Sequence, residues 1–283
     1  ASAAYAPPVA PAEPRCPAGM VFIEGGATVM GAKDMPDYTG ARSTHEAKLS
    51  PFCIEHTEVT VREYEACVKE GKCERTPDDV DYEGIKDEAR AAYKEFCNAR
   101  KPERLDHPIN CVDWEMATKF CAWKSARLPT EAEWELAARG PEQRDYPWGS
   151  AAPDATRLNA AGLEFSAWSE AKGMKPGTLY DKDDGHVGTS PVGFFKAGAT
   201  PQGVYDLAGN VFEWTSDWFA PYTGAPQVDP KGPPAGDERV ARGGAFNAKD
   251  ATWVRSAYRW GNIPKTYNHG IGFRCVASPK TAP

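Results

Sequence analysis

The stretch from residue 242 to 261, RGGAFNAKDATWVRSAYRWG, gathers aromatic and arginine side chains behind a pair of glycines. Such a composition is typical either of a surface that grips a ligand or of a packed interior with ion pairs. Arg255 and Arg259 are four residues apart, and in a loop-rich chain they favour structural ion pairs. Trp253 and Trp260 are better candidates for ligand contact, because an exposed indole offers a large apolar face and one hydrogen-bond donor.

Signatures of several enzyme classes are missing. The sequence has no GxSxG, P-loop, GxGxxG or HExxH motif, which argues against the enzymes that depend on them. No two histidines have metal-ligand spacing; they are His45, His56, His107, His186 and His269. The segment DKDDG at 181–185 resembles the start of an EF-hand loop, but its glycine comes one residue early and Val192 stands where a glutamate belongs. The neighbouring Asp183 and Asp184 are more typical of a solvated or cation-bound loop than of acid–base catalysis.

Composition indicates a turn-rich globular protein. The 283 residues include 26 Gly and 25 Pro, and this length favours one large domain with excursions. The net charge of -7 comes without basic runs, which argues against nucleic-acid binding. No apolar run is long enough to span a membrane. Residues 1–15, ASAAYAPPVAPAEPR, are predicted to be an Ala/Pro-rich tether. The tether suggests a removed signal peptide or anchor, and a plain disordered terminus is the equal alternative.

Cysteine usage predicts the compartment. The eight cysteines are even in number and none are spaced as CxxC, so zinc ribbons and thioredoxin-like redox motifs lack their spacing. Four disulfides suit an exported protein, which we expect to be secreted, cell-surface or periplasmic.

Turn and capping signals predict the first secondary-structure elements of the chain. Residues 19–31 alternate apolar and small residues around Gly25 and Gly26, which predicts a strand, a tight turn and a returning strand. Thr60 and Glu63 form the pattern of a capping box, so a helix is expected from about 61 to 71. The charged segment 74–106 is predicted to be an inserted helical excursion with a solvated face.

Two further helices are predicted near the middle of the chain. One begins after Asp113 and places Trp114, Ala117 and Cys121 on one inward face. The next is capped by Thr130 and runs to about residue 139. From residue 146 onward short apolar pieces alternate with Gly, Pro, Asn and Asp, and no helical period persists over three turns.

Nine motifs in one order resemble a known family. They are GMVFIEGG, EVTVREY, HPINCVDWEMATKFCAW, RLPTEAEWELAARG, YPWG, GVYDLAGNVFEWTSDW, RGGAFN, RSAYR and GIGFRC. The match covers roughly residues 17–277 and resembles the formylglycine-generating enzyme family, also called the sulfatase-modifying factor domain. The resemblance implies a single α+β domain over residues 16–280. It also implies a variant of the C-type-lectin-like fold, with little regular structure, that is disulfide-rich and stabilised by calcium.

The family's catalyst uses two cysteines after the paired glycine to hold copper(I) and oxidise a sulfatase cysteine with dioxygen. Aligning on Gly243 and Gly244 puts Ala248 at the first of these positions, and the second falls around Trp253. Neither side chain binds a soft metal as a thiolate. We therefore expect no copper and no catalytic residues, and formylglycine generation itself is not expected.

The resemblance also implies a disulfide and calcium ligands. It pairs Cys121 with Cys275. For the other six cysteines 15 pairings are open, and the best local choice joins Cys16 to Cys53, Cys67 to Cys73 and Cys97 to Cys111. One implied calcium site consists of Asp206, Gly209, Val211 and Glu213. A second consists of Asn159, Ala160, Asp184 and His186, so one or two Ca²⁺ ions are expected.

The segment after the paired glycine lies on the floor of the family's substrate groove. The residues that inherit this neighbourhood are Phe246, Asn247, Trp253, Arg255, Tyr258, Arg259, Trp260 and Tyr267. The favoured interpretation is an exported, calcium-stabilised, non-catalytic recognition or accessory module, a pseudoenzyme whose groove binds a peptide, protein or glycan. The alternative is a divergent oxidative enzyme with an unidentified metal site, for which Asn247, Asp250 and His269 are the first candidates.

Overall fold

The computed structural model describes residues 15–280, so the predicted tether lies almost wholly outside the described residues. Within that range the helices of the α type are α1 Val61–Lys69, α2 Asp87–Tyr93, α3 Trp114–Trp123, α4 Glu131–Arg139 and α5 Leu163–Ala171. The strands are β1 Met20–Ile23, β2 Gly26–Met30, β3 His45–Leu49, β4 Phe52–Glu55, β5 Phe212–Trp218, β6 Gln227–Val228, β7 Arg239–Arg242, β8 Trp260–Asn262, β9 Ile271–Gly272 and β10 Val276–Ala277. Most of the chain is loop, as the glycine and proline content predicts.

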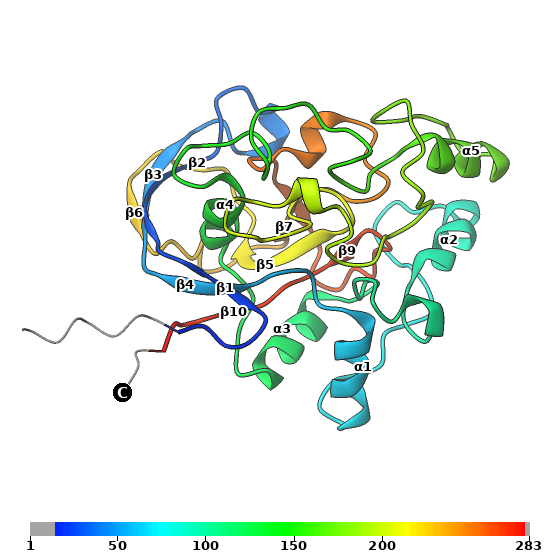
Figure 1. The fold of residues 1–283 in the computed structure, drawn as a ribbon, viewed down its shortest axis with the longest axis horizontal. Coiled ribbons are helices and arrows are strands. Elements are labelled where there is room, and N and C mark those ends of the chain that lie inside the picture. Colours follow the sequence, from blue (N-terminus) through cyan, green and yellow to red (C-terminus); the bar gives the residue numbers. More distant parts are fainter. Residues whose placement is uncertain (1–14, 281–283) are drawn as a thin grey trace, which may run out of the picture.

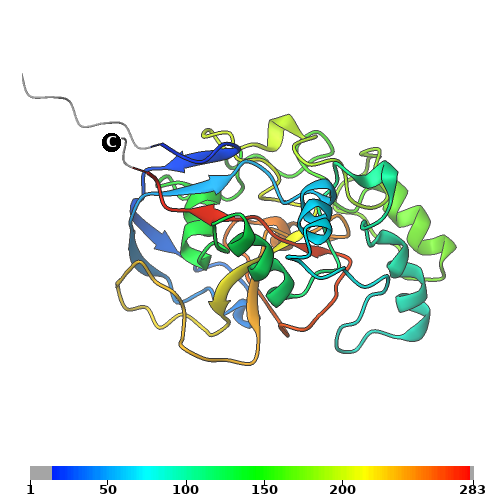
Figure 2. The same ribbon diagram turned by 90° about the horizontal axis from the view of Figure 1, so that it is seen from below.

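The strands form three small sheets. Their orders are β1-β4-β10, β2-β3-β6 and β8-β7-β5-β9. In Figure 1 the first two sheets lie on one side of the molecule, β5 and β7 lie near its centre, and α1, α2 and α5 lie on the opposite side. The two ends of the described chain lie together, because Arg15 and Lys280 exchange backbone hydrogen bonds of 3.0 and 2.9 Å (Figure 2). The helices and the small, mainly antiparallel sheets do not alternate as β-α-β units along the chain, which makes this an α+β domain.

The predicted hairpin at residues 19–31 is wrong. Gly25 forms no turn. Strand β1 pairs with β4 and β2 pairs with β3 in one continuous antiparallel register, from Met20 opposite Glu55 to Met30 opposite His45. The chain bends at Gly25 without reversing. A Cβ at Gly25 would lie 2.4 Å from the Leu49 carbonyl oxygen, so only glycine permits this close approach.

The capping signals correctly predict where helices α1, α3 and α4 begin. Thr60 and Glu63 form a capping box at the start of α1, and Thr130 and Glu133 do so at α4. The Asp113 side chain accepts a hydrogen bond from the Met116 N–H and starts α3. Each cap satisfies backbone donors that the first helical turn leaves unpaired.

Two segments depart from the sequence interpretation. Helix α5 lies in the region where no long helical period was found. Its N-cap is Gly162, which provides no side-chain cap. Neither a capping residue nor an amphipathic pattern therefore predicts this helix from the sequence. The charged excursion at 74–106 contains α2 and two short 3₁₀ turns and is otherwise loop.

All eight cysteines fall within the described residues and all form disulfides. The pairs are Cys16–Cys53, Cys67–Cys73, Cys97–Cys111 and Cys121–Cys275. These are the four pairs that the sequence analysis named. The last one joins α3 to the C-terminal strand region across 154 residues.

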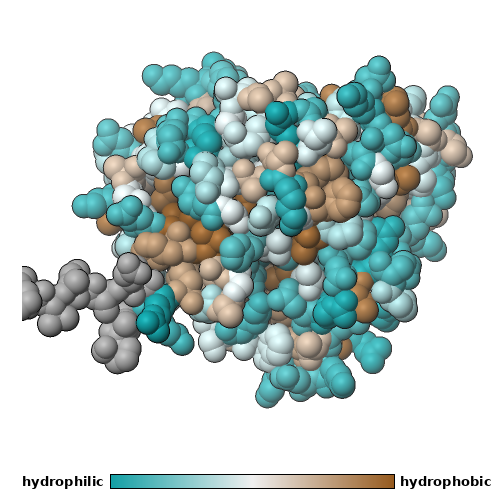
Figure 3. All heavy atoms as spheres, viewed as in Figure 1, coloured by the Kyte–Doolittle hydropathy of each residue, from teal (hydrophilic) through white to brown (hydrophobic). Residues whose placement is uncertain are grey.

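The core is packed around buried tryptophans with satisfied donors. The Trp134 indole donates to the Glu213 carboxylate at 2.9 Å, and the Trp214 indole donates to the Val112 carbonyl at 3.0 Å. On the face in Figure 3, polar residues cover most of the surface and apolar residues emerge in small separate patches. In residues 15–280 no helix is long and apolar enough to cross a membrane.

Candidate functional site

A pocket of about 300 Å³ opens beside the segment that follows the paired glycine. Aromatic and amide side chains dominate its wall, which consists of Tyr82, Phe212, Asn247, Trp253, Tyr258, Trp260, Asn268, His269 and Gly270. We call this the aromatic pocket. Its lining contains no carboxylate, lysine or arginine, so it suits an uncharged part of a ligand.

The paired glycine shapes the pocket through backbone contacts. Gly243 and Gly244 both have positive φ, 100° and 79°. A Cβ at Gly244 would lie 2.7 Å from a Val254 methyl carbon and 2.9 Å from the Trp253 carbonyl oxygen. The glycine therefore lets the turn pack against the 3₁₀ turn Ala251–Val254, which carries the exposed indole of Trp253.

His269 forms the polar base of the aromatic pocket. Its Nε2 lies 3.2 Å from the Asn247 amide nitrogen, and its Nδ1 is buried without a hydrogen-bond partner. Burial lowers the pKa of His269 to about 3, so the imidazole is neutral at physiological pH. The amide of Asn247 is then the donor and Nε2 the acceptor.

The charged excursion supplies one wall of this pocket, which sequence reasoning missed. Tyr82 lines the cavity, and the Tyr93 ring stacks on His269 with centroids 4.0 Å apart. Asp81 exchanges backbone hydrogen bonds with Tyr267, which ties the excursion to the pocket segment. Its charged residues are partly solvated, as predicted, but its aromatic residues point inward. The sequence feature that could have indicated this wall is the presence of two tyrosines, Tyr82 and Tyr93, in an otherwise charged segment.

Four of the predicted groove residues line the aromatic pocket: Asn247, Trp253, Tyr258 and Trp260. They differ in exposure, since Trp253 is 36% exposed whereas Tyr258 is 6% exposed. Trp260 is half-buried and packs on Phe212, with ring centroids 4.9 Å apart. Trp253 is thus the side chain freest to contact a ligand.

The other predicted groove residues lie elsewhere. Phe246 is fully buried and packs on Phe96, with ring centroids 5.0 Å apart, because the chain turns it into the core. The Arg255 guanidinium is committed to ion pairs with Asp34 and Asp145, each at 2.7 Å. Tyr267 is half-buried against the core and is not part of the pocket wall.

Two further side chains singled out above also have structural partners. Arg259 binds Glu131 at 2.5 Å inside the protein, as the ion-pair interpretation predicts. Asp250 caps the 3₁₀ turn by accepting from the Thr252 N–H and is not in the pocket wall, so it does not converge with Asn247 and His269.

A cluster of buried carboxylates surrounds the first predicted calcium site. Asp206 and Glu213 are joined there by Glu58, which sequence reasoning missed. Both Glu213 oxygens accept from the Arg274 guanidinium at 2.7 Å. One Glu58 oxygen accepts from the Asn210 side chain at 3.2 Å, and the other is buried without a hydrogen-bond partner. Burial, then the charges of Asp206 and Glu213, raises the pKa of Glu58 well above its ordinary value.

The charge of this cluster favours a cation, although in the described residues the carboxylate oxygens of Glu58, Asp206 and Glu213 do not all lie within 4.8 Å of one another. Three buried carboxylates face one guanidinium, and unbalanced charge in the interior is costly. A divalent cation would compensate it, and carboxylate and carbonyl oxygens are the ligands that Ca²⁺ prefers. Gly209, with φ of 83°, and the fully buried Val211 lie in the same turn. Their carbonyls are the additional ligands that the family resemblance implies.

The second predicted calcium set fits less well, because Tyr180 engages it. The Tyr180 hydroxyl lies 2.5 Å from an Asp184 carboxylate oxygen and 3.3 Å from the Ala160 carbonyl oxygen. The other Asp184 oxygen accepts from the His186 N–H. Of this set only Asn159 keeps a buried side-chain oxygen without a hydrogen-bond partner.

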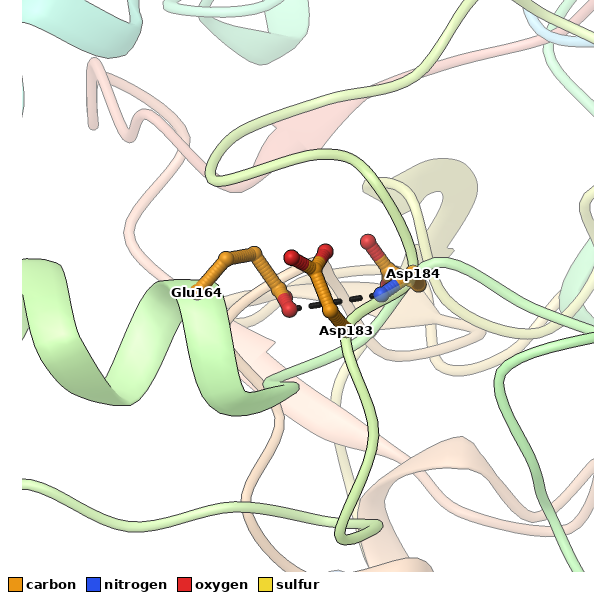
Figure 4. A group of neighbouring side chains, drawn as sticks. All are labelled: Glu164, Asp183 and Asp184. Carbon is orange, nitrogen blue, oxygen red and sulfur yellow. Dashed lines mark hydrogen bonds between the residues drawn. The ribbon is translucent and has the colours of Figure 1, made fainter.

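Next to this set, Glu164 and Asp183 join Asp184 in a small acidic group (Figure 4). Glu164 comes from the first turn of α5, and its carboxylate accepts from the Asp184 N–H at 3.3 Å. Asp183 is exposed. Hydrogen bonds within the loop therefore account for much of this arrangement.

Comparison with known proteins places these features in a family. Residues 6–279 match the family described as "Sulfatase-modifying factor enzyme 1-like domain". The formylglycine-generating enzyme of Streptomyces coelicolor is 34% identical, covering 97% of this chain and 94% of the relative. The inactive C-alpha-formylglycine-generating enzyme 2 of Bos taurus is 31% identical, covering 93% and 89%.

A solved structure supports the same assignment. PvdO from Pseudomonas aeruginosa superposes with a TM-score of 0.66 at 25% identity, covering 95% of this chain and 98% of that protein. The fold is the variant of the C-type-lectin-like fold that this family adopts. The chain belongs to the sulfatase-modifying factor family of formylglycine-generating-enzyme-like domains.

Proposed function

We propose that the protein is an exported, calcium-stabilised, non-catalytic recognition module, whose aromatic pocket holds an uncharged part of a peptide or glycan. The observation that carries the proposal is the chemistry of the pocket wall. It combines tryptophan and tyrosine faces with the amides of Asn247 and Asn268 and a neutral His269. Aromatic faces supply apolar contact area, and the amides supply oriented hydrogen bonds.

The state of the cysteines supports the non-catalytic part. All eight sulfurs are in disulfides, and no cysteine lies in the pocket wall. The family's copper(I) chemistry depends on two thiolates at this place, and Ala248 is buried where the first is expected. Relatives of both kinds are known, since the comparisons include formylglycine-generating enzymes and an inactive form.

The disulfides support export, and the carboxylate cluster supports stabilisation by calcium. Four disulfides in one loop-rich chain are typical of oxidising compartments. One Ca²⁺ held by Asp206, Glu213 and the carbonyls of Gly209 and Val211 would compensate the charge of the three buried carboxylates. Calcium would stabilise the turn that precedes β5, the strand next to the pocket, and would take no part in chemistry there.

The experiment uses the difference in burial between the exposed Trp253 and the half-buried Trp260. The purified protein is screened on arrays of glycans and of uncharged peptides, and each ligand found is measured again with Trp253→Ala and Trp260→Ala. Trp253→Ala should lower affinity at least about tenfold, about 1.4 kcal/mol, without lowering the melting temperature. Trp260→Ala should lower both, because Trp260 also packs on Phe212.

Arg255→Ala serves as the matched control, since its guanidinium is bound to Asp34 and Asp145 outside the pocket. It should alter stability and leave affinity unchanged. Ligands that bind Trp253→Ala as well as the unaltered protein would refute the proposed site. An absence of ligands on both arrays would refute the recognition role.

A further inference from the structure

A second cavity, of about 800 Å³, lies between α1, the loop closed by the Cys67–Cys73 disulfide and the segment 99–105. In Figure 1 this region is the end of the molecule around α1, below α2. Its floor is apolar, with Val68, Ala99 and Leu105 half-buried against the main core. We call this the basic cavity because of its rim.

Cationic side chains surround the basic cavity. They are Arg62, Lys69, Arg75, Arg100 and Lys101. The single acidic residue of the wall, Glu65, accepts a hydrogen bond from the Arg100 backbone N–H at 2.9 Å. The cations come from three separate parts of the sequence, which is why the chain shows no basic run although it builds a basic surface.

Only part of this positive charge is compensated. Arg62 pairs with Asp106 at 2.9 Å, and Arg100 pairs with Asp78. Within the part of the chain that the structure describes, Lys69 and Arg75 are exposed and form no ion pair. Such a concentration of unpaired cations stands out in a chain of net charge -7.

Lys101 belongs to the same uncompensated group. Its ammonium donates to the Glu95 backbone carbonyl and to no carboxylate. Burial, then the charge of Arg104, lowers the pKa of Lys101. An anion placed in the cavity would offset the charge of Arg104 and raise the pKa of Lys101 again.

We propose that the basic cavity is a docking site for a short acidic peptide segment of a partner protein. Carboxylates of the segment pair with Lys69, Arg75 and Lys101, and an apolar side chain packs on the floor. The size and the apolar floor suit a peptide better than an isolated anion. The net negative charge of the whole chain opposes binding to extended polyanions such as nucleic acid or an anionic membrane, whereas a short segment stays within the local positive field.

The test measures binding of fluorescein-labelled peptides by fluorescence anisotropy. The acidic probe ELEELE should bind with a Kd below about 1 mM, and the basic probe KLKKLK should not bind. Raising the salt from about 50 mM to about 500 mM should weaken binding of ELEELE, because exposed ion pairs are screened. This arm uses the unaltered protein and depends on no variant.

A matched pair of charge reversals locates the site. The double variant Lys69→Glu with Arg75→Glu should weaken ELEELE binding at least about tenfold. The double variant Lys33→Glu with Lys182→Glu makes the same change of net charge at exposed positions outside the cavity and should bind nearly as well as the unaltered protein. All four positions are exposed, so both variants should keep the melting temperature.

Three results of the peptide measurements would overturn the proposal. They are no binding of ELEELE up to about 1 mM, equal loss in both double variants, and equal binding of KLKKLK. Vesicles of phosphatidylserine and phosphatidylcholine provide the last arm. Vesicle binding that the cavity variant abolishes, without any peptide binding, would assign the surface to a membrane and refute a peptide partner. None of these results bears on the aromatic pocket, so the two proposals fail independently.

Discussion

Replacing Glu58 with glutamine removes one of the three buried carboxylates that face the single guanidinium of Arg274. The amide is nearly isosteric, and its oxygen can still accept from the Asn210 side chain, as Glu58 does at 3.2 Å. In calcium-free protein the substitution removes uncompensated charge, so we expect an unchanged or higher melting temperature. In calcium it removes part of the negative charge that the ion compensates, so the gain in melting temperature on adding calcium should fall.

The size of the effect follows from mass action. Calcium at about one hundred times its Kd stabilises the folded protein by about 2.7 kcal/mol. For a domain of this size about 1 kcal/mol moves the melting temperature by roughly 2–4 °C, so the unaltered protein should gain about 5–10 °C. The Glu58→Gln variant should gain less than about half of that.

The assay is differential scanning fluorimetry in EDTA and in saturating calcium. Glu131→Gln is the control, since Glu131 is a buried carboxylate that is already paired with Arg259 at 2.5 Å. Breaking that pair should cost about 3–5 kcal/mol equally with and without calcium. The reasoning is refuted if calcium raises the melting temperature of Glu58→Gln as much as that of the unaltered protein. It is refuted equally if calcium has no effect on either.

Two further predictions concern pH and the disulfides. The pKa of His269 is about 3 in the folded protein, below the ordinary histidine value of 6.5, so the unfolded chain binds the extra proton. The stability that a neutral His269 contributes should be lost as pH falls from about 6.5 toward 3, by roughly 4 kcal/mol in total, and urea titrations of His269→Gln should lack this component. Removing the Cys121–Cys275 bridge, which spans 154 residues, should cost about 5 kcal/mol, against about 2 kcal/mol for Cys67–Cys73, which spans six. Equal urea midpoints for the two alanine double variants, or a His269→Gln profile parallel to that of the unaltered protein, would contradict these expectations.

Local signals in the sequence locate the helices that have strong caps. Thr60 with Glu63 and Thr130 with Glu133 specify two helix starts, because a capping box satisfies backbone donors within four residues of chain. Helix α5 lacks such a cap and was not predicted. The strands around Gly25 were placed correctly but paired wrongly, since pairing depends on residues 45–55, which no local pattern connects to them.

The residues of the candidate sites also fall into two groups, those that local sequence motifs predict and those that only the tertiary fold brings together. Asn247, Trp253 and Trp260 follow from the motif order, because they lie on the segment that builds the aromatic pocket. Glu58 and Tyr82 did not follow, because the tertiary fold brings them to their sites from distant positions in the chain. The basic cavity shows this most clearly, because the fold brings its cationic residues together from three separate segments of the sequence.

The most direct test of the central claim is a reaction with a sulfatase-derived peptide that contains the target cysteine. The purified protein, supplied with copper(I), dioxygen and reductant, is incubated with the peptide, and mass spectrometry follows conversion of the cysteine to the aldehyde. The formylglycine-generating enzyme of Streptomyces coelicolor serves as the positive control. A non-catalytic module should leave the peptide unchanged while the control converts it. Turnover by this protein to formylglycine would contradict the account.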